Sequence, residues 1–128
     1  MKVELENQIL EFVERFYQKD TEIIEQTKLF LDTVDYDRLV ALMETIEQNH
    51  SRNAGVIHFE VIGFSYQLLG ESLIPRNIEK ALAQYSNALA SYERGMHFAT
   101  GAGEGWRFRK LYERAESRIQ QIQERNGF

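Results

Sequence analysis

Two histidine–glutamate pairs in this chain have spacings that occur in metal and catalytic sites. Glu47-x-x-His50 would place both side chains on one face of a helix, as in di-iron carboxylate proteins. Such a site needs a second Glu-x-x-His pair, which the sequence lacks. His58-x-Glu60 matches one half of a zinc deaminase signature, whose other half requires cysteines, and the chain has none. We therefore expect no metal site, and we interpret His58 and Glu60 as structural residues in an apolar stretch.

Two other features resemble catalytic or phosphate-binding machinery only superficially. Glu93 and His97 lie one helical turn apart, which suits an ion pair, but the sequence gives the histidine no nucleophile to activate. Residues 101–105 are rich in glycine but lack the Lys-Ser/Thr pair of a P-loop, and tryptophan at position 106 breaks the Gly-x-Gly-x-x-Gly spacing. The sequence therefore predicts a turn between two helices here, no catalytic residue and no bound cofactor.

The elements that would position any site are helices. Between Asn77 and Phe98, apolar residues recur at intervals of three and four, which is the periodicity of an amphipathic helix. We expect an all-α fold of five or six antiparallel helices in one domain over residues 1–128, as a monomer or a dimer. The helices predicted from such patterns span about 3–18, 21–31, 36–49, 56–69, 77–98 and 106–125.

Two of these boundaries are open or rest on capping residues. Asp20 or Thr21 can cap the second helix, although residues 19–21 are a weak break and the first two helices could be continuous. Asp35 is the expected N-cap of the third helix.

Residues 54–69 are ambiguous between helix and strand. They are rich in Val, Ile, Phe and Tyr, which favour strands. Their apolar residues come in pairs rather than in alternation, and their length suits a helix. We interpret 56–69 as a buried central helix, with Gly63 at a close helix crossing and Gly70 as its C-cap.

Composition and charge narrow the classes of partner. The chain has 128 residues and a net charge of −5, and residues 1–50 carry twelve acidic against five basic side chains. This acidic part disfavours nucleic acid as a partner and suits a basic protein. The first ten residues do not resemble a signal peptide, and no stretch is apolar enough to cross a membrane. We expect a cytoplasmic protein that does not bind membranes.

The acidic residues gather around a turn and the helix that follows it. Acids at a helix start also favour the helix dipole, which is an alternative reason for their presence. In the functional interpretation, exposed carboxylates surround Tyr36, which acts as an aromatic anchor for a basic partner. The residues that we expect to bind the partner are Asp32, Asp35, Tyr36, Asp37, Glu44 and Glu47.

One short pattern resembles a known repeat. Ala81-x-x-x-Tyr85-x-x-Ala88 resembles the second helix of a tetratricopeptide repeat, in which two small residues flank an aromatic one. Residues 63–98 would then form one helical hairpin of that type. Leu69 stands where the repeat has a small residue, and no second copy follows at a period of 34. The resemblance implies antiparallel helical hairpins and a role as a protein-binding adaptor or regulatory subunit.

In overall character the chain is similar to the immunity proteins of bacterial toxin systems, which are small, acidic, single-domain and often free of cysteine. This similarity implies a non-enzymatic inhibitor that binds and neutralises a cognate toxin, such as a nuclease with a basic cleft. A small enzyme is the competing class, and His58, Glu60 and His97 are the residues from which its site would have to be built.

Overall fold

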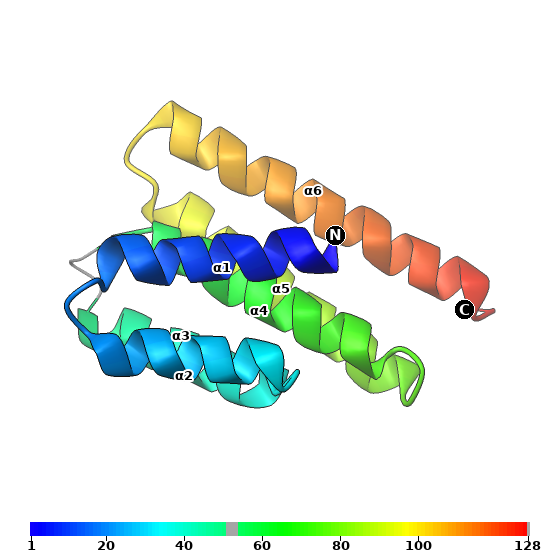
Figure 1. Cartoon of the computed structure of the whole chain (residues 1–128). Helices are drawn as coiled ribbons and strands as arrows, with labels where there is room; N and C mark the ends of the chain where they lie inside the picture. Colours follow the sequence, from blue (N-terminus) through cyan, green and yellow to red (C-terminus); the bar gives the residue numbers. More distant parts are fainter. Residues whose placement is uncertain (51–53, 128) are drawn as a thin grey trace.

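The computed structural model describes residues 1–50 and 54–127, and within these residues it contains helices and no strands. Figure 1 shows an all-α bundle of consecutive antiparallel helices, which confirms the predicted fold class. The six helices are α1 (Lys2–Phe16), α2 (Thr21–Asp32), α3 (Tyr36–His50), α4 (Ile57–Leu73), α5 (Ile78–Phe98) and α6 (Ala102–Arg125). None of the helices in the described part is long and apolar enough to cross a membrane.

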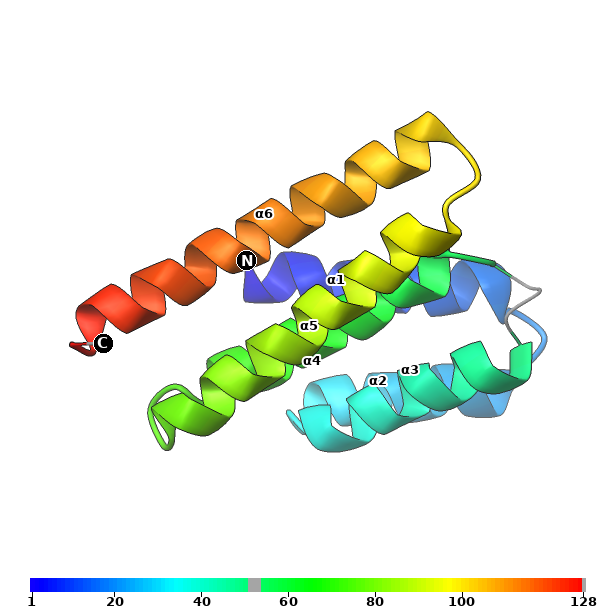
Figure 2. The same cartoon turned by 180° about the vertical axis from the view of Figure 1, so that it is seen from behind.

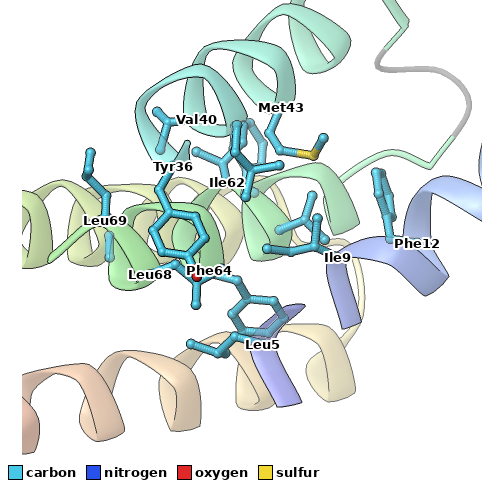
Figure 3. Packing of buried hydrophobic residues seen from close by; sticks show 14 of the residues in the cluster. Leu5, Ile9, Phe12, Tyr36, Val40, Met43, Ile62, Phe64, Leu68 and Leu69 are labelled. Carbon is cyan, nitrogen blue, oxygen red and sulfur yellow. The ribbon is translucent and has the colours of Figure 1, made fainter. Parts of the chain in front are cut away.

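The ambiguous segment forms the central helix of the bundle, as predicted. Nearly every residue of α4 between His58 and Gly70 is buried, because α1, α3 and α5 all pack against it. Figure 2 shows α5 lying along α4, and Figure 3 shows side chains of α1 and α3 converging on it. A helix surrounded on several sides needs apolar residues around most of its circumference. This explains why its sequence lacks a clear amphipathic stripe.

Two glycines allow α5 to approach α4 closely. A Cβ atom at Gly63 would overlap ring carbons of Tyr92, and a Cβ atom at Gly70 would lie 2.8 Å from Cδ2 of Tyr85. The close crossing expected at Gly63 is therefore confirmed. The expectation that Gly70 caps the helix is wrong, because α4 continues to Leu73. Gly70 lies within the helix, and its lack of a side chain leaves room for the Tyr85 ring.

Helix α6 is held against both α5 and α4. The ring of Phe108 occupies the space that a side chain at position 95, a glycine, would need. Two carboxylates of α4 also pair with arginines of α6, Glu60 with Arg107 and Glu71 with Arg118. Eleven residues separate the two pairs on each helix, which is about three helical turns. The two ion pairs therefore bridge α4 and α6 at two levels of the bundle.

The helix boundaries confirm one prediction that had an open alternative and correct another. The first two helices are separate, because the chain turns after Phe16 and Asp20 caps α2 by accepting a hydrogen bond from the Ile23 amide at 3.2 Å. Helix α6 begins at Ala102 rather than at Trp106. Most of the glycine-rich segment is therefore the first turn of this helix. The Glu104 carboxylate accepts a hydrogen bond from the Thr100 amide at 3.1 Å, as a glutamate in the first turn of a helix often does.

Replacement by alanine should change the free energy of unfolding in opposite directions at a helical glycine that contacts a ring and at one with no neighbouring atoms. Gly63→Ala should lower the free energy of unfolding by about 1–3 kcal/mol, because the added methyl group collides with Tyr92 in a packed core. Gly103→Ala is the matched control, since nothing lies within 4 Å of its Cβ position. This variant should raise the free energy of unfolding by up to about 1 kcal/mol through helix propensity. Urea denaturation of both variants measures the difference, and equal effects would show that α4 and α5 are not in close contact.

Candidate functional site

The predicted acidic cluster is divided between capping and exposed residues. Asp32 and Asp37 are exposed at the turn between α2 and α3. Asp35 caps α3, since its Oδ1 atom accepts a hydrogen bond from the Arg38 amide at 3.4 Å. Its other carboxylate oxygen lies 3.4 Å from the Arg38 guanidinium. Asp35 therefore has a structural role, and Asp32 and Asp37 are the acids of this turn that remain exposed for a partner.

The expectation that Tyr36 is an exposed anchor is wrong. Its side chain is 3% exposed and points into the core, where Figure 3 places it near Leu68 and Leu69. Its hydroxyl donates a hydrogen bond to Oε2 of Glu6 at 3.1 Å, and burial together with Glu6 raises the pKa of Tyr36. The signal was present in the sequence, because Tyr36 begins a helical series that continues with buried Leu39 and Val40.

Two aliphatic residues that the sequence reasoning missed supply an apolar surface at this turn. Leu29 is 55% exposed and Val34 is 48% exposed. Val34 also has a φ angle of +56°, a conformation that β-branched residues rarely adopt. The amide of Asp35 bonds to the Phe30 carbonyl at 2.8 Å, and the amide of Val34 bonds to the Leu31 carbonyl at 3.3 Å. This is a Schellman motif with valine at the position that glycine usually occupies.

The last two predicted residues, Glu44 and Glu47, lie at a different place. They are on α3, about 10 Å and about 15 Å further along the helix axis than Asp37, taking about 1.5 Å per residue. They line a groove of about 300 Å³ between α3, α4 and α5, together with Tyr66 and Arg94. The Tyr66 hydroxyl donates a hydrogen bond to Glu44 at 2.8 Å, and burial followed by Glu44 raises the pKa of Tyr66 to about 12. The six predicted residues therefore do not form one surface.

His58 is a buried residue whose two ring nitrogens both have partners. Its Nδ1 atom lies 2.9 Å from the Gly55 carbonyl oxygen, and its Nε2 atom lies 2.6 Å from the Tyr17 hydroxyl. A carbonyl can only accept, so Nδ1 carries a hydrogen and, in the neutral ring, Nε2 accepts from the tyrosine. Burial raises the pKa of Tyr17 to about 12, which keeps this hydroxyl protonated. The arrangement links the end of α1 to the start of α4 and supports the structural interpretation.

Glu60 lies two residues after His58 and lines a pocket between α1, α4 and α6. Its carboxylate accepts two hydrogen bonds from the Arg107 guanidinium, one of them at 3.1 Å between Nη2 and Oε2. Phe12, Phe16 and Phe108 contribute aromatic walls to the pocket, whose volume is about 370 Å³. The sequence reasoning missed this site, since its residues come from segments far apart in the chain.

The remaining candidates form no further site among the described side chains. His97 is exposed and packs edge-on against the ring of Phe98, with centroids 4.8 Å apart. Within residues 1–50 and 54–127, no three His, Cys, Asp or Glu residues gather in a way that could hold a metal ion. This absence does not cover the Glu47-x-x-His50 pair, because the His50 side chain is not among those that the structure describes.

Relief of the backbone strain at Val34 should stabilise the protein. Val34→Gly should raise the free energy of unfolding by about 1 kcal/mol, because glycine adopts the left-handed conformation without a steric penalty. Thr33→Gly is the control one residue earlier, where φ is −91°, and it should be destabilising. Chemical denaturation of both variants measures the two effects. A loss of stability in Val34→Gly would contradict the strained conformation.

Comparison of the chain with protein-family models, with curated proteins and with solved structures finds no match in any of the three searches.

Proposed function

We propose that this protein is a non-enzymatic protein-binding domain whose partner is a basic protein. In its most concrete form it is an immunity-type inhibitor that binds and neutralises a cognate toxin, such as a nuclease with a basic active-site cleft. The main support for the proposal is the surface at the turn between α2 and α3. Exposed Leu29 and Val34 lie there together with exposed Asp32 and Asp37.

The composition of this turn suits a protein partner. Protein interfaces commonly have an apolar centre that excludes water and a polar rim. Leu29 and Val34 supply the apolar part, and Asp32 and Asp37 supply a rim of negative charge. Residues 1–50 carry the entire acidic excess of the chain, which would accelerate the approach of a basic partner through long-range attraction. Charge would therefore set the association rate, and apolar contact would set the dissociation rate.

The strain at Val34 supports a role for its side chain outside the fold. Glycine would satisfy the Schellman motif better, so valine at this position costs stability. Unfavourable backbone conformations concentrate at binding and catalytic sites. An exposed valine in such a conformation is consistent with selection for contact with a partner.

The competing class is a small enzyme. A general base must lie within hydrogen-bond reach of a substrate proton. Both ring nitrogens of His58 are already used within the protein, and the Glu60 carboxylate is paired with Arg107. These contacts favour structural roles for both residues and support the binding class over the enzyme class.

A second candidate within the binding class is a tetratricopeptide-like adaptor or regulatory subunit. It is favoured by the packing of α4 against α5, where Gly70 contacts the Tyr85 ring and Ala81 and Ala88 are buried on either side of that tyrosine. A partner that has no toxic activity would favour this candidate over the immunity-type inhibitor.

The test begins with capture of the partner from the native host by the full chain, followed by binding kinetics with the purified partner. Asp32→Lys combined with Asp37→Lys should slow association at least about tenfold at low ionic strength, because attraction becomes repulsion. The difference should shrink at high salt, where exposed charges are screened over less than about 10 Å. If the partner is a toxin, wild-type protein should inhibit its activity, and the variant should require higher concentrations.

Two control variants separate docking from general effects of charge and stability. Glu116→Lys combined with Glu124→Lys makes the same change in net charge on the exposed surface of α6 and should alter association much less. Val34→Gly should speed dissociation although it stabilises the fold, so its defect cannot come from unfolding. Unchanged kinetics in both the aspartate and the valine variants would place the interface elsewhere and reject the docking surface. An isolated partner that is acidic would reject the proposed partner class.

A further inference from the structure

The pocket between α1, α4 and α6 has the composition of a ligand site. Its volume of about 370 Å³ lies within the range of small-molecule and side-chain pockets. Apolar side chains and charged groups both line it, and among the carboxylates is that of Glu60, whose side chain is only 10% exposed. The apolar residues that line the pocket are Phe12, Phe16, Val56, Ile57 and Phe108. It lies where α1 ends and where α4 and α6 begin, at the end of the bundle opposite the α2–α3 turn (Figure 1).

The two members of the ion pair at this pocket are very unequally exposed. The Glu60 side chain is 10% exposed, whereas the Arg107 side chain is 65% exposed. Glu60 is therefore fixed within the protein, and Arg107 approaches it from the solvent side. A buried carboxylate needs a charged or hydrogen-bonding partner, but that partner need not come from the same chain.

The charges around the pocket favour a cation over an anion. Glu11, Glu60 and Glu104 contribute three carboxylates to its lining, against the two guanidinium groups of Arg15 and Arg107. The guanidinium of Arg107 is already committed to Glu60. The guanidinium of Arg15 lies over the Phe16 ring, 5.1 Å from its centroid.

These two arginines also show how the pocket binds a guanidinium group. One stacks on an aromatic ring, and the other forms a bidentate pair with a carboxylate. Both modes are characteristic of arginine and are poorly reproduced by lysine.

We propose that this pocket binds an arginine side chain of a partner protein, whose guanidinium replaces that of Arg107 on Glu60. The aliphatic stem of the incoming arginine would then pack between Phe12 and Phe108. Arg107 acts as an internal occupant that satisfies Glu60 when no partner is present. An arginine is the occupant to which we commit, because a flat cationic group on an apolar stem matches both the carboxylate and the aromatic walls.

The inference concerns a different surface from that of the proposed function and can be tested without the partner. Benzamidine, benzamide and benzoate share one ring and differ in charge, so they are suitable probes. Titration of the isotope-labelled full chain, followed by amide chemical shifts, should show benzamidine binding with shifts centred on Ile57 and Phe108. Benzamide and benzoate should bind at least about tenfold more weakly, which corresponds to the loss of one charge-assisted hydrogen bond. Acetyl-arginine methylamide should compete with benzamidine, and its citrulline counterpart should not.

Two variants should change benzamidine affinity in opposite directions. Glu60→Gln removes the carboxylate and should reduce affinity at least about tenfold. Arg107→Ala removes the internal competitor and should increase affinity severalfold, because the incoming cation no longer displaces a guanidinium. Glu71→Gln is the matched control. Glu71 forms the equivalent ion pair with Arg118 three turns along, and it does not line this pocket.

The outcome with wild-type protein alone can overturn the inference, so it does not depend on the folding of any variant. Equal binding of the three ring probes, or stronger binding of benzoate, would reject a cation site. Failure of the arginine derivative to compete would limit the site to free aromatic amidines and reject the protein side chain as occupant. Weaker benzamidine binding in Arg107→Ala, with a helical circular dichroism spectrum retained, would reject the exchange. None of these results bears on the α2–α3 turn, whose test uses Asp32, Asp37 and Val34.

Discussion

The close contact between α4 and α5 organises the whole bundle. Gly63 faces Tyr92 and Gly70 faces Tyr85, so two glycines and two tyrosines, each seven residues apart, meet in antiparallel register. The tyrosine rings occupy the volume that side chains on α4 would fill. Because a shift of register would bring a ring against a bulkier residue, the packing fixes how the two helices align. Three further helices pack on this pair, α1 and α3 on α4 and α6 on α5, and α2 packs on α1 and α3.

Polar side chains on a helix that is buried on several sides need hydrogen-bond partners within the protein. This need determines where the polar contacts of the bundle lie. The Tyr92 hydroxyl donates to the Gln67 side chain, and the Ser91 hydroxyl donates to the Phe59 carbonyl at 2.7 Å. His58 instead bonds to Tyr17, just after α1, and to the Gly55 carbonyl, and Glu60 pairs with Arg107 of α6. Polar groups in a core cost stability unless they are paired. The pairs therefore specify which helix faces which, and Glu60 at the edge of the bundle is also the residue that an incoming cation could reach.

The two proposed binding surfaces lie at opposite ends of the bundle and have different physical origins. The α2–α3 turn presents exposed side chains at a strained helix terminus, and its proposed affinity for a partner depends on charge and on contact with Val34. The pocket beside Glu60 is a cavity formed where three helices meet, and its proposed affinity for a partner depends on a buried carboxylate. A basic partner could use either surface. Binding of a partner at the two surfaces should depend differently on salt concentration, because exposed charges are screened by salt far more than buried ones.

The helices follow from the sequence alone, because hydrophobic periodicity and capping residues are local properties of the chain. The sequence predicted the central position of residues 56–69, the close crossing at Gly63 and the cap at Asp35, and the structure bears these out. Features that depend on partners distant in sequence follow only from the packing of the helices. Gly70 contacts Tyr85 rather than capping α4, and Glu60 pairs with Arg107, 47 residues away. Helical periodicity indicates which face of a helix is apolar, but only packing determines which helix covers that face and which side chains remain exposed.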